Sequence, residues 1–160
     1  MRNTLYLSHM GNLIIKSSAF KDGERIPAKY TCDGDNVNPF LEIRNVPQGT
    51  KNLALIVDDP DATNGGVWDH WIIWNIEPGT QYIAEDTVPH GSVQGKSSWG
   101  SRRYGGPCPR EGSAPHRYMF KLYALDTTLE LPEESGKTEL LQAIEGHILD
   151  EAILMGKYGR

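Results

Sequence analysis

Two apolar segments joined by a polar loop constrain the fold of this chain more than any other feature. Residues 53–57 have the sequence LALIV, and no polar residue alternates within this run. We therefore interpret it as a fully buried β-strand, and residues 70–76 (HWIIWNI) as a second buried strand. The loop between them carries several carboxylates. Because rigid strands often present functional side chains at their ends, we expect the functional site of the protein at the loop that joins these two strands.

Three further segments, 13–15, 40–43 and 118–125, are also strand candidates. Only the C-terminal region has helical spacing, because its apolar residues recur at steps of three and four. These residues are Leu141, Ile144, Ile148, Ala152 and Met155, and Gly146 could divide them into two short helices. We expect one mostly β domain, residues 10–160, with short C-terminal helices. Residues 1–9 resemble a cloning leader and are excluded from this interpretation.

The net charge of −5 and the pI near 5.5 argue against binding to nucleic acid or to an anionic membrane surface, since both favour basic proteins. No apolar stretch approaches the roughly 20 residues that span a bilayer. No secretory signal is visible, so we expect a cytoplasmic protein without integral membrane association. Its two cysteines, Cys32 and Cys108, form no CxxC pattern, and we expect two free thiols.

Asp59, Asp61 and His70 form the first group of candidate site residues. A carboxylate beside an imidazole fixes the tautomer of the ring and favours its charged form. Such a ring can bind an anion or act in acid–base chemistry. The alternative interpretation is structural: Asp-Pro-Asp is good turn chemistry, and a histidine near tryptophans is often only packed.

A second group lies at residues 104–109 (YGGPCP) and 115–118 (PHRY). Paired glycines let the backbone approach a ligand closely and can point N–H groups at an anion. His116 stands where a long loop, residues 88–112, gives way to a strand, as His70 does at its own strand. The alternative is a surface loop stiffened by prolines, with Arg117 in a salt bridge.

Other chemistries have less support. No Gly-x-Ser-x-Gly elbow is present, which argues against a serine hydrolase. Cys108 and His116 could in principle form a nucleophile–base pair. Zinc could be held by Asp59, His70 and His116, but HExxH-type spacing is absent. We therefore predict no catalytic residue, no metal and no cofactor.

Four motifs in series resemble the phosphatidylethanolamine-binding protein family, in its bacterial and archaeal branch. They are Asp59-Pro60-Asp61-Ala62, Trp68-x-His70-Trp71, Gly105-Gly106-Pro107-Cys108-Pro109 and His116-Arg117-Tyr118. Residues 31–34 (TCDG) and 146–149 (GHIL) are similar to that branch, and the resemblance runs from about Leu13 to the C-terminus. Two positions depart from the family pattern, since Thr63 and Arg110 stand where prolines are usual.

The resemblance implies a large antiparallel sheet packed on a smaller one, and a small pocket for phosphoryl groups, phosphate, acetate or similar ions. The residues implied are Asp59, His70, Gly106, His116 and Tyr118, with Asp61 and Pro107 close by. It also brings Cys32 and Cys108 near one another, which would permit a disulfide, although free thiols remain the expectation. Family members are mostly binding or regulatory proteins, some similar to kinase-pathway regulators and others to serine-protease inhibitors.

We therefore expect a non-enzymatic protein that binds a phosphoryl group or another small anion, alone or on a protein partner such as a protease or a kinase. His70 and His116 would donate to the anion, and Asp59, beside His70, would orient an imidazole. The first alternative is a serine-protease inhibitor that acts through surface loops. An enzyme that uses the histidine–aspartate pair is the second.

Overall fold

The computed structural model describes residues 11–63 and 65–160, so the expected leader at residues 1–9 lies outside the described residues. Within them the chain forms two antiparallel sheets, with strand orders β6-β4-β3-β7-β8 and β1-β2-β5. The strands are β1 (Ile14–Lys16), β2 (Leu41–Arg44), β3 (Asn52–Asp59), β4 (Trp68–Ile76), β5 (Tyr82–Ile83), β6 (Val93–Gln94), β7 (His116–Leu125) and β8 (Ile148–Tyr158); the helices are the 3-10 helix η1 (Ala28–Tyr30) and α2 (Lys137–Ile144).

Strand β3 is buried along its whole length, which confirms the interpretation of its uninterrupted apolar sequence. It lies at the centre of the larger sheet, between β4 and β7. Successive residues of a strand point to opposite faces, so both faces of β3 must be covered by other elements. Leu53 and Leu55 belong to one hydrophobic cluster, whereas Ala54 and Ile56 belong to another.

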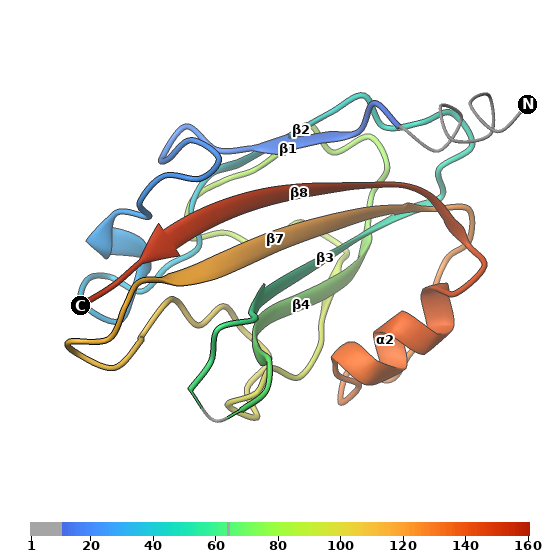
Figure 1. Cartoon of the computed structure of the whole chain (residues 1–160). Coiled ribbons are helices and arrows are strands. Elements are labelled where there is room, and N and C mark those ends of the chain that lie inside the picture. Colours follow the sequence, from blue (N-terminus) through green and yellow to red (C-terminus); the bar gives the residue numbers. More distant parts are fainter. Residues whose placement is uncertain (1–10, 64) are drawn as a thin grey trace, which may run out of the picture.

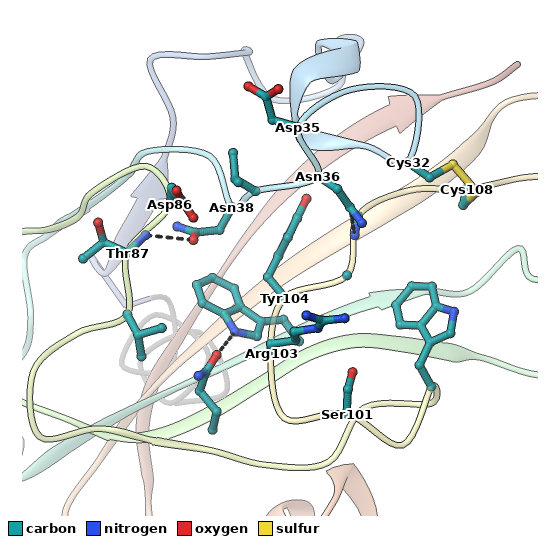
Figure 2. Close-up of a pocket in the computed structure, with 17 residues that line it drawn as sticks. Cys32, Asp35, Asn36, Asn38, Asp86, Thr87, Ser101, Arg103, Tyr104 and Cys108 are labelled. Atoms are coloured by element: carbon teal, nitrogen blue, oxygen red, sulfur yellow. Dashed lines mark hydrogen bonds between the residues drawn. A yellow bond between two sulfur atoms is a disulfide. The ribbon is translucent and has the colours of Figure 1, made fainter.

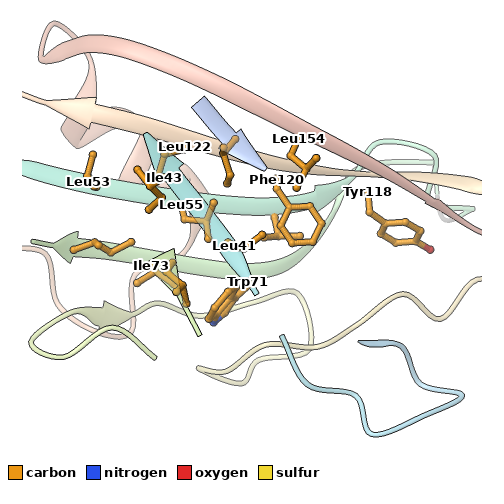
Figure 3. Close-up of a cluster of buried hydrophobic side chains, with 14 of the residues drawn as sticks. Leu41, Ile43, Leu53, Leu55, Trp71, Ile73, Tyr118, Phe120, Leu122 and Leu154 are labelled. Carbon is orange, nitrogen blue, oxygen red and sulfur yellow. The ribbon is translucent and has the colours of Figure 1, made fainter. Parts of the chain in front are cut away.

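The first cluster fills the space between the two sheets. Leu41 and Ile43 of β2 face Leu55 of β3, Trp71 of β4 and Phe120 of β7 across this layer (Figure 3). All five are buried, and they come from both sheets. The expected packing of a large antiparallel sheet on a smaller one is therefore confirmed.

The second cluster lies on the opposite face of the larger sheet. Figure 1 shows α2 on this side, whereas β1 and β2 lie on the other. Leu140 and Ile144 of α2 are buried with Ile72 and Trp74 of β4. The helix therefore covers the second face of the central strands.

The expected second C-terminal helix is wrong, because residues 148–158 form β8. This strand pairs with β7 along its length, from Leu125↔Ile148 to His116↔Tyr158. The apolar residues fit a helical stripe, but Leu154, Gly156 and Tyr158 also alternate as a strand, and all three are buried. Pairing with β7 and burial of this face decide between the two patterns.

No helix among residues 11–63 and 65–160 has the length and hydropathy needed to cross a membrane.

Cys32 and Cys108 form a disulfide, which corrects the expectation of two free thiols. Their Cα atoms lie 5.4 Å apart, although 76 positions separate them in sequence. Two backbone N–H groups hold the same loops together: that of Cys32 donates to the carbonyl of Pro107, and that of Gly106 donates to the Asn36 side chain. The spacing of the two cysteines in the sequence alone could not predict that these loops lie together.

Substitutions at two neighbouring positions of β8 test whether its side chains alternate between a buried and an exposed face. Leu154 is 1% exposed and Ile153 is 50% exposed. Leu154→Ala should lower the free energy of unfolding by about 2–5 kcal/mol, because it leaves a cavity between the sheets. Ile153→Ala should change it by no more than about 0.5 kcal/mol. Urea denaturation measures both, and equal losses would contradict the strand assignment.

A second test concerns the disulfide. Unfolded protein kept without reductant should show no free thiol in a thiol titration. The double variant Cys32→Ser/Cys108→Ser should lose about 4 kcal/mol of unfolding free energy, because the bridge restricts a long loop of the unfolded chain. Both cysteines are exposed, so the new hydroxyls can be hydrated. Two titratable thiols per chain would rule the bridge out.

Candidate functional site

The predicted residues of β3, β4 and β7 meet at one end of the larger sheet. Asp59 ends β3, His70 lies near the start of β4, and His116 begins β7. Because neighbouring strands are antiparallel, the end of β3 lies between the starts of β4 and β7. Asp59 and His116, 57 positions apart in the chain, are therefore in contact.

Asp59 orients His116. The His116 Nδ1 atom lies 2.8 Å from the Asp59 Oδ2 atom, and both side chains are buried. The other oxygen of Asp59 accepts a hydrogen bond of 2.8 Å from the backbone N–H of Asp61. Asp59 therefore orients an imidazole as expected, but the ring that it contacts is that of His116, whereas only its charge acts on His70. The physical reason is that β7, as well as β4, borders the end of β3.

A β-bulge sets the direction of His70. Trp71 pairs with Val57 and Asp69 pairs with Asp58, so His70 is an extra residue on β4 with no partner opposite it on β3. Its ring stands edge-on to Tyr118, with ring centroids 5.2 Å apart. Tyr118 belongs to the cluster between the sheets, so the bulge places His70 on the same side of the sheet as that cluster.

The His70 ring is held by the backbone and by aromatic neighbours. Its Nδ1–H donates to the carbonyl oxygen of Gly105 over 2.7 Å, and the Trp99 ring lies edge-on with a centroid distance of 4.9 Å. Burial lowers the pKa of His70, and this effect outweighs the hydrogen bond to Gly105 and the nearby Asp59 charge, which both raise it.

These side chains line a cavity of about 330 Å³. Burial, followed by the negative charge of Asp59, raises the pKa of Tyr118, so its phenol stays protonated at neutral pH. Arg110 brings a cationic side chain to the same cavity. The complete lining is Asp59, Ala62, Thr63, Trp68, His70, Trp99, Cys108, Pro109, Arg110, His116 and Tyr118.

Asp61 lies beside this cavity and is engaged by Arg117. Its Oδ2 atom accepts from the Arg117 backbone N–H over 2.9 Å and from Nε over 3.0 Å, and its Oδ1 atom accepts from the guanidinium at 2.9 Å. These hydrogen bonds lower the pKa of Asp61 to about 2. The salt bridge considered for Arg117 is thus present, and it connects the β3–β4 loop to the start of β7.

Gly106 and Pro107 shape the adjoining loop. A Cβ atom on Gly106 would stand 2.2 Å from the Tyr30 carbonyl oxygen, so only glycine fits where the two loops touch. The Gly106 N–H donates to Asn36 over 2.7 Å and is therefore already engaged. Gly106 lines a second cavity, and the anion-binding role expected for these two residues stays a prediction.

That second cavity is larger, about 720 Å³, and lies next to the first. Figure 2 shows the disulfide at one end of it and Tyr104 and Arg103 near its middle. Trp99 and Cys108 line both cavities. Sequence reasoning missed Trp99, and its only signal was an aromatic residue in a long Gly- and Pro-rich loop.

Among residues 11–63 and 65–160, no group of three or more histidine, cysteine, aspartate or glutamate side chains is arranged to hold a metal ion.

The fold and the arrangement of these motifs define a class, and comparison with known proteins identifies it. The family model described as phosphatidylethanolamine-binding protein matches residues 16–159, and the chain belongs to this family. A UPF0098 protein of Methanothermobacter thermautotrophicus is 49% identical over 151 residues, which cover 91% of this chain and 98% of that relative.

Two crystal structures are also similar. A putative phosphatidylethanolamine-binding protein homolog of Chlamydia trachomatis has a TM-score of 0.87 and 41% identity, with coverage of 92% of this chain and 97% of that one. E. coli YbcL has a TM-score of 0.88 and 31% identity, with coverage of 94% and 99%. A carboxypeptidase Y inhibitor, solved with its cognate proteinase, shares the fold at 17% identity, with coverage of 92% and 82% and a TM-score of 0.54.

The lowered pKa of His70 predicts a pH dependence of stability. The unfolded ring has a pKa of about 6.5 and binds a proton more readily than the folded one. The contribution of neutral His70 is therefore complete above about pH 6.5 and is lost as the pH falls through the lower folded-state pKa. Urea denaturation at pH 7.5 and pH 5 should show a larger loss for the native protein than for His70→Asn, which cannot titrate. Equal losses would mean that burial does not disfavour the charged ring.

Proposed function

We propose that this protein is a non-enzymatic binding protein whose 330 Å³ cavity takes a small anionic group of the phosphoryl type. The observation that supports this best is the buried His116–Asp59 pair on the cavity wall, next to a second imidazole. The volume is at the lower end of the range for small-molecule sites, which suits a single phosphoryl group.

The charges on the cavity wall support an anion as the ligand. Protonated His116 would donate from its Nε2 atom, to which none of the described residues forms a hydrogen bond, and a hydrogen bond from a charged donor is stronger than one from a neutral donor. Arg110 adds a second positive charge. The Asp59 carboxylate opposes an anion, but His116 and the Asp61 N–H engage both of its oxygens.

The phosphoryl group could be free or could belong to a protein partner, such as a kinase-pathway component. The alternative function is inhibition of a serine protease through the surface loops. It is supported by the fold shared with the carboxypeptidase Y inhibitor. A cytoplasmic location stays a prediction, because disulfides are typical of oxidising compartments but also occur inside hyperthermophile cells.

Calorimetry with inorganic phosphate tests the proposal. His116→Ala should weaken binding by about 1.5–3 kcal/mol, the range for a hydrogen bond with a charged partner. His147→Ala is a matched control, because His147 Nδ1 also lies 2.8 Å from a carboxylate oxygen, that of Asp126, but this pair is exposed. The control should bind phosphate with unchanged affinity.

Two results would contradict the proposal. The first is unchanged affinity in His116→Ala. The second is an absence of phosphate binding by the native protein, combined with nanomolar inhibition in an assay of several serine proteases, which would favour the alternative function.

A further inference from the structure

The hydrogen bonds at the cavity define where the His70 ring carries its proton. Its Nδ1 atom lies 2.7 Å from the carbonyl oxygen of Gly105. A carbonyl oxygen only accepts hydrogen bonds, so Nδ1 must carry the hydrogen. In the neutral ring, Nε2 then has a lone pair and no hydrogen. No hydrogen bond to Nε2 is formed by any of the described residues, so this acceptor is left for a ligand.

The surroundings of His70 favour the neutral ring. The residue is 3% exposed and stands edge-on to Trp99 and Tyr118. The charged and titratable groups around it are the carboxylates of Asp58, Asp59 and Asp69, from β3 and β4, with Arg110 and the His116 ring on the cavity wall. The carboxylates favour the imidazolium, but desolvation outweighs them and lowers the pKa of His70.

His116 differs from His70 in one respect. Its Nδ1–H also faces an acceptor, but this acceptor is the Asp59 carboxylate, which can balance the charge of a protonated ring. When His116 is protonated, its Nε2 becomes a charged donor. The cavity lining then contains a donor, His116 Nε2, and an acceptor, His70 Nε2.

We propose that His70 determines the specificity of the anion site and selects anions that carry an O–H group of their own. Such anions are hydrogen phosphate and singly protonated phosphomonoesters. They can donate to His70 Nε2 while another oxygen accepts from His116. Sulfate and phosphodiesters have no such hydrogen, so an oxygen of theirs would face the Nε2 lone pair. A site built around a ligand O–H strongly rejects analogues that lack it.

This inference rests on the proposed function and makes it more specific. An intact phospholipid carries its headgroup on a phosphodiester, whereas a free headgroup phosphate or a phosphorylated side chain is a monoester. The cavity would therefore take monoesters and exclude phospholipids whose only phosphate is a diester.

Calorimetry at pH 6.0 with four probes tests it: phosphate, monomethyl phosphate, sulfate and dimethyl phosphate. At this pH both forms of inorganic phosphate carry an O–H group, and about half or more of the monoester is singly protonated. The native protein should bind phosphate at least about tenfold more tightly than sulfate, although sulfate carries the larger charge. Monomethyl phosphate should exceed dimethyl phosphate by a similar factor.

His70→Asn identifies the residue responsible. Its amide N–H can still donate to Gly105, but it lacks an acceptor at the Nε2 position. The ratio of phosphate to sulfate affinity should fall to about threefold or less, whereas His147→Asn should preserve it. A loss of packing alone would weaken the binding of both anions and leave the ratio of their affinities unchanged.

The outcomes separate the two proposals. If the native protein binds none of the four anions, the proposed function fails. If it binds sulfate as tightly as phosphate, or dimethyl phosphate as tightly as monomethyl phosphate, the anion site stands and the selection rule is overturned. A preserved phosphate preference in His70→Asn overturns the role of His70. The comparison of the four anions in the native protein tests the selection for an O–H group even if His70→Asn does not fold.

Discussion

Strand β3 is packed on both faces, and both hydrophobic clusters depend on this double burial. Its alternate residues enter the layer between the sheets and the layer under α2. The same alternation continues into the polar end of the strand, where Asp58 contacts Lys121 and Asp59 contacts His116. The alternation of side chains that places the core residues on two faces therefore also places the Asp59 carboxylate at the cavity.

The floor and the rim of the site are built differently. The residues of the floor belong to strands, and their positions follow from register. The rest of the cavity lining comes from loops, namely residues 62–63, Trp99 and residues 108–110, and the Cys32–Cys108 bridge ties the last of these to the loop that holds Cys32. Rigid strands thus hold the imidazoles, whereas loops supply the remaining lining residues.

The sequence predicted the sheets, because buried strands and turn residues leave strong local patterns, and the family resemblance grouped Asp59, His70, His116 and Tyr118, which line one cavity. Three features needed the three-dimensional structure. The bulge at His70 arises from pairing between strands, the partner of Asp59 comes from a third strand, and the disulfide joins distant loops. The apolar residues of the β8 segment fit both a helical and a strand pattern, so only its pairing with β7 could decide between them.

Trp99 stands between the two cavities and is 47% exposed. A wall shared by two spaces cannot move without changing the shape of both. An occupant that displaces this indole from one side therefore alters the free energy of occupancy on the other side, and thermodynamic linkage makes the effect equal in both directions. The indole is at the same time an intrinsic fluorophore placed at this boundary, and Trp68 and Trp71, which each line one of the two cavities, emit beside it.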